Sequence, residues 1–577
     1  MREDIRQEKT KKRLRIKPII PFSIALILIL IFGVLYFIQK SVGNLTLLSF
    51  YDYHTELTTD DYNVVLEDEI VNLLHKPKLI DNIIYIPVDF IFEYVDKYIY
   101  WDGQENILVI TTQDKVIRMK PYEKDYYING RRLSCETPIS MIRGVAYVPE
   151  DIVMLNYDVR ISRDADNKLV IVDYTGREHK EGIIASKIAR VRYEADKESP
   201  LAATISKGDK VCVYGETEGF TKIRLQNGVT GYVETKQLDK VNIVPAEVEQ
   251  DTALVDEPLF EGDVCVVWDQ VFNTTANRNE WRYVKPYGVD VLSPTWFSFD
   301  EEKLDGKIID IGDKGYVEWA HENGIQVWGL LSDNFKESVS SSVLTSTAVR
   351  GDVIKQLLAL AQKYGLDGIN IDFEQVRYED ASLFIQFLRE LYPVMRENNL
   401  ILSVDMYVPK PFNIYYNRTE AAKASDYIII MGYDEYWSTS PEAGPVASIG
   451  FAEDGIIETL KEVPKDKIIL GVPVFTRIWK DAAGVISSSA YSMQDGLDIF
   501  VDAGAEFTWL EDKGCYYSEY EVEEDGITVK YMIWLEDERS LSEKLKLVDK
   551  YDIAGVAVWK RGLEKDFVWE LISGYLD

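Results

Sequence analysis

The sequence predicts a multidomain protein that ends in an α/β domain, a (β/α)8 TIM barrel, preceded by smaller modules. A chain of 577 residues is too long for one hydrophobic core. The composition changes beyond residue 260, where eleven of the twelve tryptophans lie. Over 261–577, eight apolar strand-like runs alternate with helical ones, which is the pattern of such a barrel. The runs are Val264–Trp268, Val289–Leu292, Ile325–Leu331, Gly368–Phe373, Ile401–Met406, Tyr427–Met431, Ile468–Val474 and Ile553–Trp559.

Composition and charge exclude several classes of protein. A hydrophobic content of 46% with 12% aromatic residues excludes a largely disordered chain. The formal charge is −33, yet residues 1–17 carry eight basic and three acidic side chains, so the remainder is at −38. The strongly negative charge of the chain beyond residue 17 argues against nucleic acid or anionic lipid as the main partner. The four cysteines and four histidines are scattered without metal-ligand spacing, so we expect neither a metal site nor a cofactor.

Residues 19–39 are predicted to form a single transmembrane helix. Ile19–Ile38 is an uncharged, almost wholly apolar run of 20 residues, enough to span a bilayer. The basic tail of residues 1–18 places the N-terminus in the cytoplasm and everything after Lys40 outside the cell. We therefore expect a single-pass cell-membrane protein whose larger part is extracellular. A cleaved signal peptide is the alternative, but no convincing A-x-A site follows the run.

An internal repeat occupies the next region, residues 40–176. Tyr85-Ile-Pro87-Val-Asp89 recurs 62 residues later as Tyr147-Val-Pro149-Glu-Asp151. Each copy has the pattern of a short strand, a helical patch and a strand pair around a polar turn, a duplicated α+β module. It resembles the module named after the N-terminal domain of copper amine oxidases, which recurs as a stalk in bacterial surface proteins. The resemblance implies a spacer or wall-contact role and no copper.

Residues 177–240 contain short β-rich runs separated by turns. The pair Asn227-Gly228 between two strands is a good hairpin signal. The order of the runs resembles a bacterial Src-homology-3-like (SH3-like) domain, a small all-β barrel. That resemblance implies cell-wall binding, although such barrels also serve as spacers. An acidic linker, residues 241–260, separates this domain from the large barrel.

Helices are readable between the strand-like runs of the barrel. Val353–Lys363 has apolar residues at helical spacing and stops before Gly365, a plausible glycine just after a helix C-terminus. The next helix carries an apolar stripe that includes Phe384 and Leu391.

The fourth run carries the most informative motif of the chain, Asp367-Gly-Ile-Asn-Ile-Asp-Phe-Glu374. As a strand it places Asn370, Asp372 and Glu374 on one face. Such a polar row is costly unless it meets solvent, a ligand or hydrogen-bond partners. Two carboxylates this close perturb each other's pKa, which suits a site that keeps one acid protonated near neutral pH. An edge strand with a solvated face is the alternative. In a barrel, Glu374 would lie at the mouth, where active sites form, with Asp372 and Asn370 deeper.

The motif resembles the DxxDxDxE pattern of glycoside hydrolase family 18, the chitinase-like enzymes. Met431-Gly-Tyr433-Asp434 resembles the M-x-Y-D of that family's sixth strand, and Trp559 its tryptophan beneath the sugar at the cleavage site. One departure is that Asn370 replaces the middle aspartate, so Asp372 lacks the carboxylate neighbour with which it would share a proton. The branch that acts on spore and wall peptidoglycan also has asparagine here, and the run Pro473–Trp479 resembles that branch too.

The resemblance implies substrate-assisted catalysis. Glu374 would be the acid and then the base, Asp372 would orient the substrate's acetamide, and Tyr433 would hydrogen-bond its acetyl oxygen. A further set is expected to bind substrate. Its members are Asn370, Asp367, Met431, Asp434 and Trp559, with Trp296 and Asn334 as residues that either line subsites or have core and loop roles.

The sequence therefore predicts a membrane-anchored extracellular hydrolase of β-1,4 bonds in N-acetylglucosamine-containing cell-wall glycan (peptidoglycan). A chitinase or endo-β-N-acetylglucosaminidase acting on another glycan is one alternative. A catalytically inert, lectin-like binder of chitin-like polymers is another, although such binders typically lack the acid and Glu374 is present.

Overall fold

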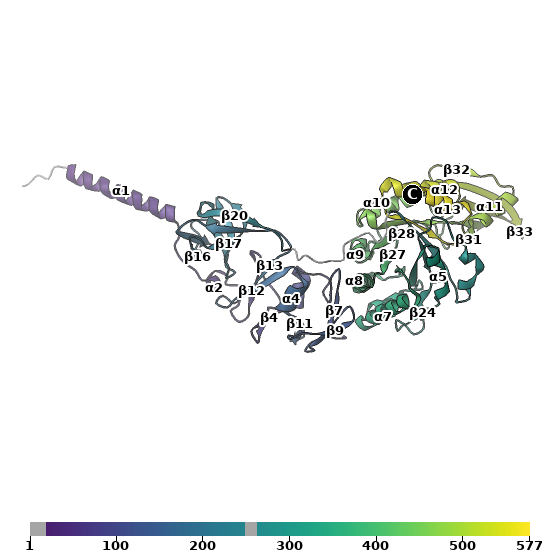
Figure 1. The fold of residues 1–577 in the computed structure, drawn as a ribbon. Helices are drawn as coiled ribbons and strands as arrows, with labels where there is room; N and C mark the ends of the chain where they lie inside the picture. Colours follow the sequence, from purple (N-terminus) through teal and green to yellow (C-terminus); the bar gives the residue numbers. More distant parts are fainter. Residues whose placement is uncertain (1–18, 248–261, 577) are drawn as a thin grey trace, which may run out of the picture. The chain divides into compact units, whose positions relative to one another are not determined.

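The computed structural model describes residues 19–247 and 262–576 (Figure 1). Contacts divide the chain into two compact units. The first comprises the residues up to 90 together with 147–251, and the second comprises 91–146 together with the residues from 252 onward. The basic tail, residues 1–18, and most of the linker, 241–260, lie outside the described residues.

The prediction that residues 19–39 form a transmembrane helix is wrong. A helix, α1, covers Ile19–Val42. A bilayer span needs about 20 consecutive apolar residues in one helix, and no helix in the described ranges is long and apolar enough to cross a membrane. The single-pass localisation and the membrane partner were inferred from this helix alone, and both are corrected with it.

The two copies of the repeat pair with each other in the first unit. Strands β4 (Ile83–Pro87) and β11 (Val145–Pro149) are antiparallel, with Ile86 opposite Val148. These two residues are equivalent in the repeat, so an approximate two-fold axis relates the paired strands. The other elements between residues 50 and 174, apart from a sheet of the second unit described below, are α2 (Phe50–Tyr53), β1 (Asn63–Leu66), β2 (Glu69–Val71), β3 (Lys78–Ile80), α3 (Val88–Tyr94), β10 (Ser140–Ile142), α4 (Glu150–Asn156), β12 (Val159–Asp164) and β13 (Leu169–Tyr174).

The β-rich region that follows is a seven-stranded antiparallel sheet around its own small core. Its buried residues include Val191, Val211 and Ile223. The Asn227-Gly228 turn joins two paired strands, and Gly228 has a φ of 84°, the left-handed region that favours glycine. The strands are β14 (His179–Ile184), β15 (Ile188–Arg192), β16 (Leu201–Ser206), β17 (Lys210–Thr217), β18 (Phe220–Arg224), β19 (Thr230–Glu234) and β20 (Leu238–Val244).

The second unit contains the predicted barrel, a closed ring of eight parallel strands. The ring closes because the last strand pairs with both the first and the seventh. All eight predicted runs are barrel strands, since buried parallel strands require near-continuous apolar sequence. They are β21 (Val264–Asp269), β22 (Val291–Pro294), β25 (Gln326–Ser332), β26 (Gly368–Asp372), β27 (Ile401–Tyr407), β28 (Tyr427–Met431), β29 (Ile468–Pro473) and β35 (Gly555–Trp559).

Helices follow most of these strands and cover the barrel. Helix α7 (Thr347–Tyr364) starts where Ser346 Oγ accepts a hydrogen bond from Val349 N–H, and it ends at Gly365, whose φ is 75°. The predicted glycine stop is therefore confirmed. The other helices are α5 (Lys314–Glu322), α6 (Glu337–Leu344), α8 (Ala381–Glu397), α9 (Arg418–Lys423), α10 (Ile449–Thr459), α12 (Glu538–Tyr551) and α13 (Phe567–Leu576). A hairpin, β23 (Phe297–Phe299) and β24 (Ile308–Asp310), follows β22.

An insertion between β29 and β35 forms a five-stranded antiparallel sheet that the sequence analysis does not predict. Trp479 in it is fully buried, and its Nε1 donates to the backbone oxygen of Gly444, 2.8 Å away, in the loop after β28. The insertion thus braces one wall of the barrel mouth. Its elements are β30 (Phe475–Ala482), β31 (Val485–Ser492), α11 (Met493–Asp502), β32 (Thr508–Leu510), β33 (Cys515–Glu524) and β34 (Ile527–Leu535).

A second antiparallel sheet, from the middle of the repeat region, packs on helices α7 and α8 of the barrel. Val109 and Val116 of this sheet belong to the same hydrophobic cluster as the barrel core. Buried Glu390 on α8 pairs with Arg350 on α7, 2.9 Å away, and with Arg118 of the sheet. Burial alone would raise the pKa of Glu390, but the two arginines outweigh it and the net pKa is lowered. The strands are β5 (Tyr100–Asp102), β6 (Ile107–Thr111), β7 (Val116–Met119), β8 (Asp125–Ile128) and β9 (Arg131–Ser134).

Replacing Glu390 is expected to destabilise the barrel. The Glu390→Gln variant leaves two guanidinium groups without their anion, and loss of one partner in a buried ion pair costs about 3–5 kcal/mol. The lower urea midpoint can be followed by tryptophan fluorescence, because eleven of twelve tryptophans lie beyond residue 260. The control is Glu397→Gln on the same helix, whose partner Arg131 is largely exposed. That variant should cost about 1 kcal/mol or less, and equal losses in both would contradict a specific role for the buried pair.

Candidate active site

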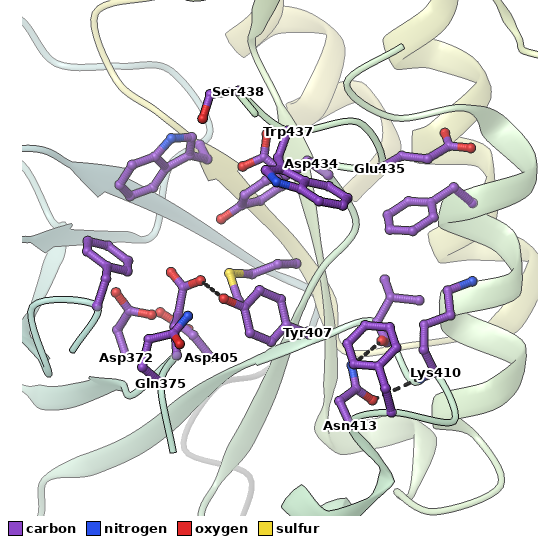
Figure 2. Close-up of a pocket in the computed structure, with 18 of the residues that line it drawn as sticks. Asp372, Gln375, Asp405, Tyr407, Lys410, Asn413, Asp434, Glu435, Trp437 and Ser438 are labelled. Atoms are coloured by element: carbon purple, nitrogen blue, oxygen red, sulfur yellow. Dashed lines mark hydrogen bonds between the residues drawn. The ribbon is translucent and has the colours of Figure 1, made fainter. Parts of the chain in front are cut away.

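The motif residues Asp372 and Glu374 line a cavity of about 790 Å³ at the barrel mouth (Figure 2). Strand β26 ends at Asp372, and Glu374 follows two residues later, so the strand direction brings both carboxyl groups to the carboxyl-end face of the barrel. Tyr433 and Trp559, from the ends of β28 and β35, line the same cavity. The structure therefore brings these four predicted residues together.

A second cavity of about 640 Å³ continues from the first toward β21, β22 and β25. Asp372 and Trp559 line both cavities, whereas Glu374 lines only the first. Trp296 and Asn334, the two tentative subsite residues of the sequence analysis, line the second. Asp372 and Trp559 therefore mark the junction of the two cavities, and Glu374 lies on the side of the first cavity.

The environment of Glu374 keeps this carboxyl protonated at a much higher pH than usual. Burial raises the pKa of Glu374 to about 7. The Tyr407 hydroxyl donates a hydrogen bond to Glu374 Oε2, which lowers this pKa, while the charges of Asp333 and Asp434 raise it further. Tyr416 fixes the position of the acid, because its hydroxyl donates to the backbone oxygen of Glu374 at 2.8 Å.

Asp372 lies deeper and is only 8% exposed. Burial raises its pKa well above the ordinary value, and the nearby charges of Glu374, Asp405 and Asp333 raise it further. The pKa of Tyr433 is also raised, first by burial and then by nearby carboxyl groups that include Asp405 and Glu374, so its hydroxyl remains a hydrogen-bond donor at neutral pH. The site therefore contains several acids that cannot all be ionised together.

Asn370 and Asp405 form a buried polar bridge beneath these acids. Asn370 is fully buried and lines neither cavity. Its Nδ2 donates to Asp405 Oδ1 at 2.8 Å, and its Oδ1 accepts from Trp268 Nε1 at 3.1 Å. Asp405 lines the first cavity, as Figure 2 shows beside Asp372. Asp405 was not predicted from the sequence, although a carboxylate inside the apolar run Ile401–Met406 was a detectable signal.

The Trp559 indole forms part of the cavity wall and packs with other aromatic rings. Its centroid is 5.9 Å from the Trp268 ring and 6.5 Å from the Tyr433 ring, nearly parallel to the latter. Just beyond it, Arg561 donates from its backbone N–H to Trp268 O at 3.0 Å. The end of β35 is therefore tied to the end of β21.

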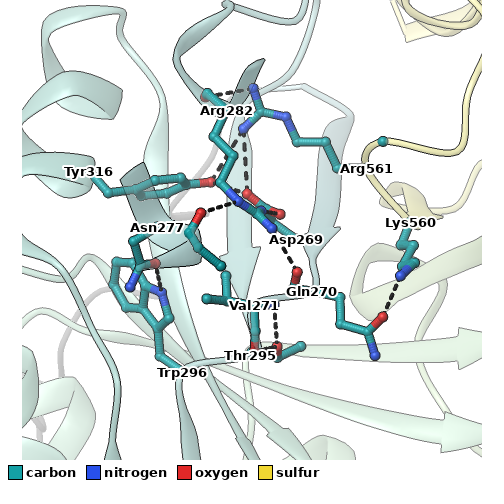
Figure 3. Close-up of polar contacts among 12 residues, drawn as sticks. Asp269, Gln270, Val271, Asn277, Arg282, Thr295, Trp296, Tyr316, Lys560 and Arg561 are labelled. Carbon is teal, nitrogen blue, oxygen red and sulfur yellow. Dashed lines mark hydrogen bonds and ion pairs between the residues drawn. The ribbon is translucent and has the colours of Figure 1, made fainter. Parts of the chain in front are cut away.

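A buried ionic cluster, shown in Figure 3, secures the same corner. Asp269 at the end of β21 accepts a hydrogen bond of 2.8 Å from the Tyr316 hydroxyl. The guanidinium groups of Arg282 and Arg561 pair with its two carboxylate oxygens. Figure 3 also shows Lys560 reaching Gln270, which lines the second cavity. These contacts hold the loops after β21 and β35 as a fixed wall.

The remaining predicted substrate-binding residues fall in different places. Met431 and Asp434 line the first cavity, and Asp434 pairs with Arg477 of the insertion at 3.6 Å. Trp296 is almost fully buried, and its Nε1 donates to Asn277 at 2.7 Å. Asp367 lies before the start of β26, where it contacts His321 and lines neither cavity.

Several cavity residues were not anticipated from sequence. They are Phe335, Gln375, Tyr407, Lys410, Phe412, Asn413 and Trp437. Most come from loops after β25, β27 and β28, where no periodic pattern marks a functional residue. Within the described residues, no group of three His, Cys, Asp or Glu side chains is arranged to hold a metal ion.

A carboxylic acid poised near neutral pH in a barrel-mouth cleft with an aromatic wall is the type of site that glycoside hydrolases use. Comparison with protein families agrees. Residues 320–564 match glycosyl hydrolases family 18, residues 53–172 match the copper amine oxidase N-terminal domain, and residues 189–239 match the bacterial SH3 domain. The chain thus carries a family 18 glycoside hydrolase domain, and the two N-terminal resemblances are confirmed.

The chain is similar to several proteins at low sequence identity. The uncharacterized glycosylase YvbX of Bacillus subtilis is 24% identical over 312 residues, 52% of this chain and 88% of that protein. The cortical fragment-lytic enzyme of the same species is 25% identical over 256 residues, 43% of this chain and 58% of that protein. Among solved structures, the Bacillus cereus spore cortex-lytic enzyme SleL aligns with a TM-score of 0.49 and 18% identity, covering 65% of this chain and 90% of that one.

The hydrogen bond from Tyr407 leads to a prediction about pH dependence. Glu374 must be protonated to act as an acid, so kcat/KM should fall as pH rises through about 7, the pKa of this carboxyl. Tyr407→Phe removes a donor that stabilises the ionised form, so the pKa of Glu374 should rise further. The alkaline limb of the pH–rate profile should therefore move to higher pH.

The matched control is Tyr415→Phe, in the loop after β27, whose hydroxyl donates to Val376 O at 3.1 Å and not to the acid. Its profile should coincide with that of the unmodified protein. An alkaline limb that stays in place, or moves to lower pH, in Tyr407→Phe would show that this bond does not tune Glu374.

Proposed function

We propose that the family 18 domain cleaves β-1,4 bonds of N-acetylglucosamine-containing cell-wall peptidoglycan, by substrate-assisted catalysis with retention of configuration. The observation that carries the proposal is the grouping of Glu374, Asp372, Tyr433 and Trp559 around one cavity. Each of the four residues has a role in this reaction that its surroundings support.

Protonation of the leaving group is the first requirement, and Glu374 supplies it. With a pKa of about 7 a large fraction of this carboxyl is protonated at neutral pH, and the proton is still given up readily. The leaving sugar lies on the acid's side of the cleaved bond. Because Glu374 lines only the first cavity, the leaving sugar would occupy that cavity, and the sugar that is attacked would lie at the junction against Trp559.

The nucleophile in this proposal is the acetamide carbonyl oxygen of the substrate. Burial raises the pKa of Asp372 well above its ordinary value, which favours the protonated form, a poor nucleophile. Its position instead suits it to accept a hydrogen bond from the acetamide N–H, while the Tyr433 hydroxyl donates to the carbonyl oxygen. The attack breaks the glycosidic bond and forms an oxazolinium ion, and Glu374, now ionised, then activates the water that opens it.

Cell-wall glycan is favoured as substrate by two considerations. One relative is named for lysis of cortical fragments, and a bacterial SH3 domain precedes the barrel. The chemistry itself needs only an N-acetyl group beside the cleaved bond, so chitin oligomers remain a second candidate that the same cavity would accept.

The position of Lys410 favours peptidoglycan over chitin as the substrate. It lines the first cavity, on the leaving-group side, with its Nζ 5.3 Å from the centre of the Phe451 ring. In Figure 2 it lies across the cavity from Asp372 and Asp405. Peptidoglycan differs from chitin by a lactyl group on alternate sugars, which bears a carboxylate once stem peptides are removed. An ammonium group on the leaving-group side would attract this anion.

The acid assignment is tested by incubating the protein and its Glu374→Gln variant with peptidoglycan and with chitin oligomers. New reducing ends are identified by mass spectrometry. The variant should lose activity by at least about 100-fold, because one residue serves as both acid and base. Glu379→Gln, an exposed residue in the following loop, is the control and should behave like the unmodified protein. Equal release by the protein and Glu374→Gln would refute the assignment, and no release by either would favour a glycan-binding protein.

The substrate assignment is tested with Lys410→Met on glycan strands stripped of stem peptides and on chitin oligomers. Loss of a charge-assisted contact should lower kcat/KM on the stripped strands by about tenfold. On chitin oligomers the change should stay within about twofold, since no carboxylate is present. A parallel loss on both polymers would mean that Lys410 shapes the cavity and does not select an acidic sugar.

A further inference from the structure

Asn370, the asparagine of the strand motif on β26, is hydrogen-bonded to a carboxylate on the neighbouring strand β27. Asn370 Nδ2 donates to Ser403 Oγ at 3.0 Å and to Asp405 Oδ1 at 2.8 Å, both on β27. Its Oδ1 accepts from Trp268 Nε1 and Ser293 Oγ, at 3.1 and 3.3 Å. The Asn370 amide therefore donates two hydrogen bonds and accepts two, so all of its hydrogen-bonding capacity is used. These bonds hold its NH2 group toward β27.

The register of the two strands brings Asp405 beside Asp372. Strands β26 and β27 are parallel, with Asn370 opposite Ser403 and Ile371 opposite Val404. Asp372 and Asp405 are the next residues on each strand. Adjacent strands lie about 4.8 Å apart, and residues two apart on a strand share a face. Both carboxyl groups therefore point to the barrel interior with Asn370, and both line the first cavity.

We infer that Asp405 is the carboxylate that shares a proton with Asp372, and that Asn370 and Asp405 together take the place of an aspartate at position 370. The inference rests on the proposed function, in which Asp372 accepts a hydrogen bond from the acetamide N–H when substrate binds. Asp405 is a positioning residue in this scheme, since it acts through Asp372 and does not touch the reacting atoms.

Two desolvated carboxyl groups on neighbouring strands cannot both be ionised, so they hold one proton between them. Burial raises the pKa of both carboxyl groups, but the hydrogen bond from Asn370 lowers that of Asp405, so in this scheme the proton lies on Asp372 before substrate binds. When the substrate acetamide arrives, Asp372 accepts a hydrogen bond from its N–H, and the proton moves to Asp405. The pair keeps one proton and one negative charge throughout, so the step needs no external acid or base.

The surroundings of the pair are mainly acidic. Titratable and charged groups near it come from the ends of β25, β26, β27 and β28, whereas the contacts from β21 and β22, Trp268 and Ser293, are uncharged. These groups are Asp333, Glu374, Tyr407, Tyr433 and Asp434, with Lys410 lining the same cavity.

The test compares Asp405→Asn with the exchanged double variant Asn370→Asp/Asp405→Asn, which returns the carboxylate to β26. Asp405→Asn keeps an oxygen to accept from Asn370, so the fold should persist, and its melting temperature checks this. We expect kcat to fall by about tenfold or more, with KM changed by no more than about twofold. The double variant should recover most of the lost kcat. If Asp405 only accepts a hydrogen bond, Asp405→Asn will retain full kcat, and that result would overturn the inference.

A measurement without turnover separates this inference from the proposed function. Carbon-13 labelling of aspartate carboxyl groups, with Asp372→Asn to assign the signal, follows the ionisation of Asp372 by NMR. Its pKa should drop in Asp405→Asn, because a neighbouring like charge is removed, and should rise again in the double variant. An unchanged titration would overturn the inference even if the enzyme is active. If the protein releases no glycan, the proposed function fails, while the titration still decides whether the two carboxyl groups share a proton.

Discussion

Removal of carboxyl groups from water at the mouth of the barrel is the constraint on which the rest of the site depends. A pKa of about 7 for Glu374, against an ordinary value of 4.5, corresponds to roughly 3 kcal/mol of preference for the protonated form. The surrounding fold must supply this free energy. The free energy needed to keep this carboxyl out of water explains why so many side chains at the barrel mouth are aromatic or held by hydrogen bonds.

The supports of the site come from nearly every part of the barrel. Tyr416 fixes the backbone at Glu374, Asp333 accepts a hydrogen bond from the N–H of Gln375 at 2.8 Å, and the Asp269 cluster secures the loop beyond Trp559. The insertion after β29 contributes Arg477, which pairs with Asp434. Each contact restricts how far the acids can move toward solvent, and together they keep the desolvated state in place.

Sequence reasoning succeeded where a local pattern reflects a local physical requirement. Buried parallel strands need continuous apolar runs, so all eight barrel strands could be located, and the alternation within Asp367–Glu374 predicted that Asp372 and Glu374 share a face, where both line the first cavity. It failed where the requirement is tertiary. Asp405 becomes meaningful only through the register of β26 and β27, and the sheet formed by 475–535 depends on long-range pairing. The transmembrane prediction relied on an apolar run alone, and the structure overturns it.

The most direct test of this account is the ionisation of Glu374 itself. Carbon-13 labelling of glutamate carboxyl groups, with the Glu374→Gln spectrum subtracted, gives the titration of this one side chain in the free protein. The expected midpoint lies near pH 7, the pKa of this carboxyl, which is raised mainly by burial. A midpoint near the ordinary glutamate value of 4.5 would mean that the acid is ionised in neutral solution, and the central claim would be wrong.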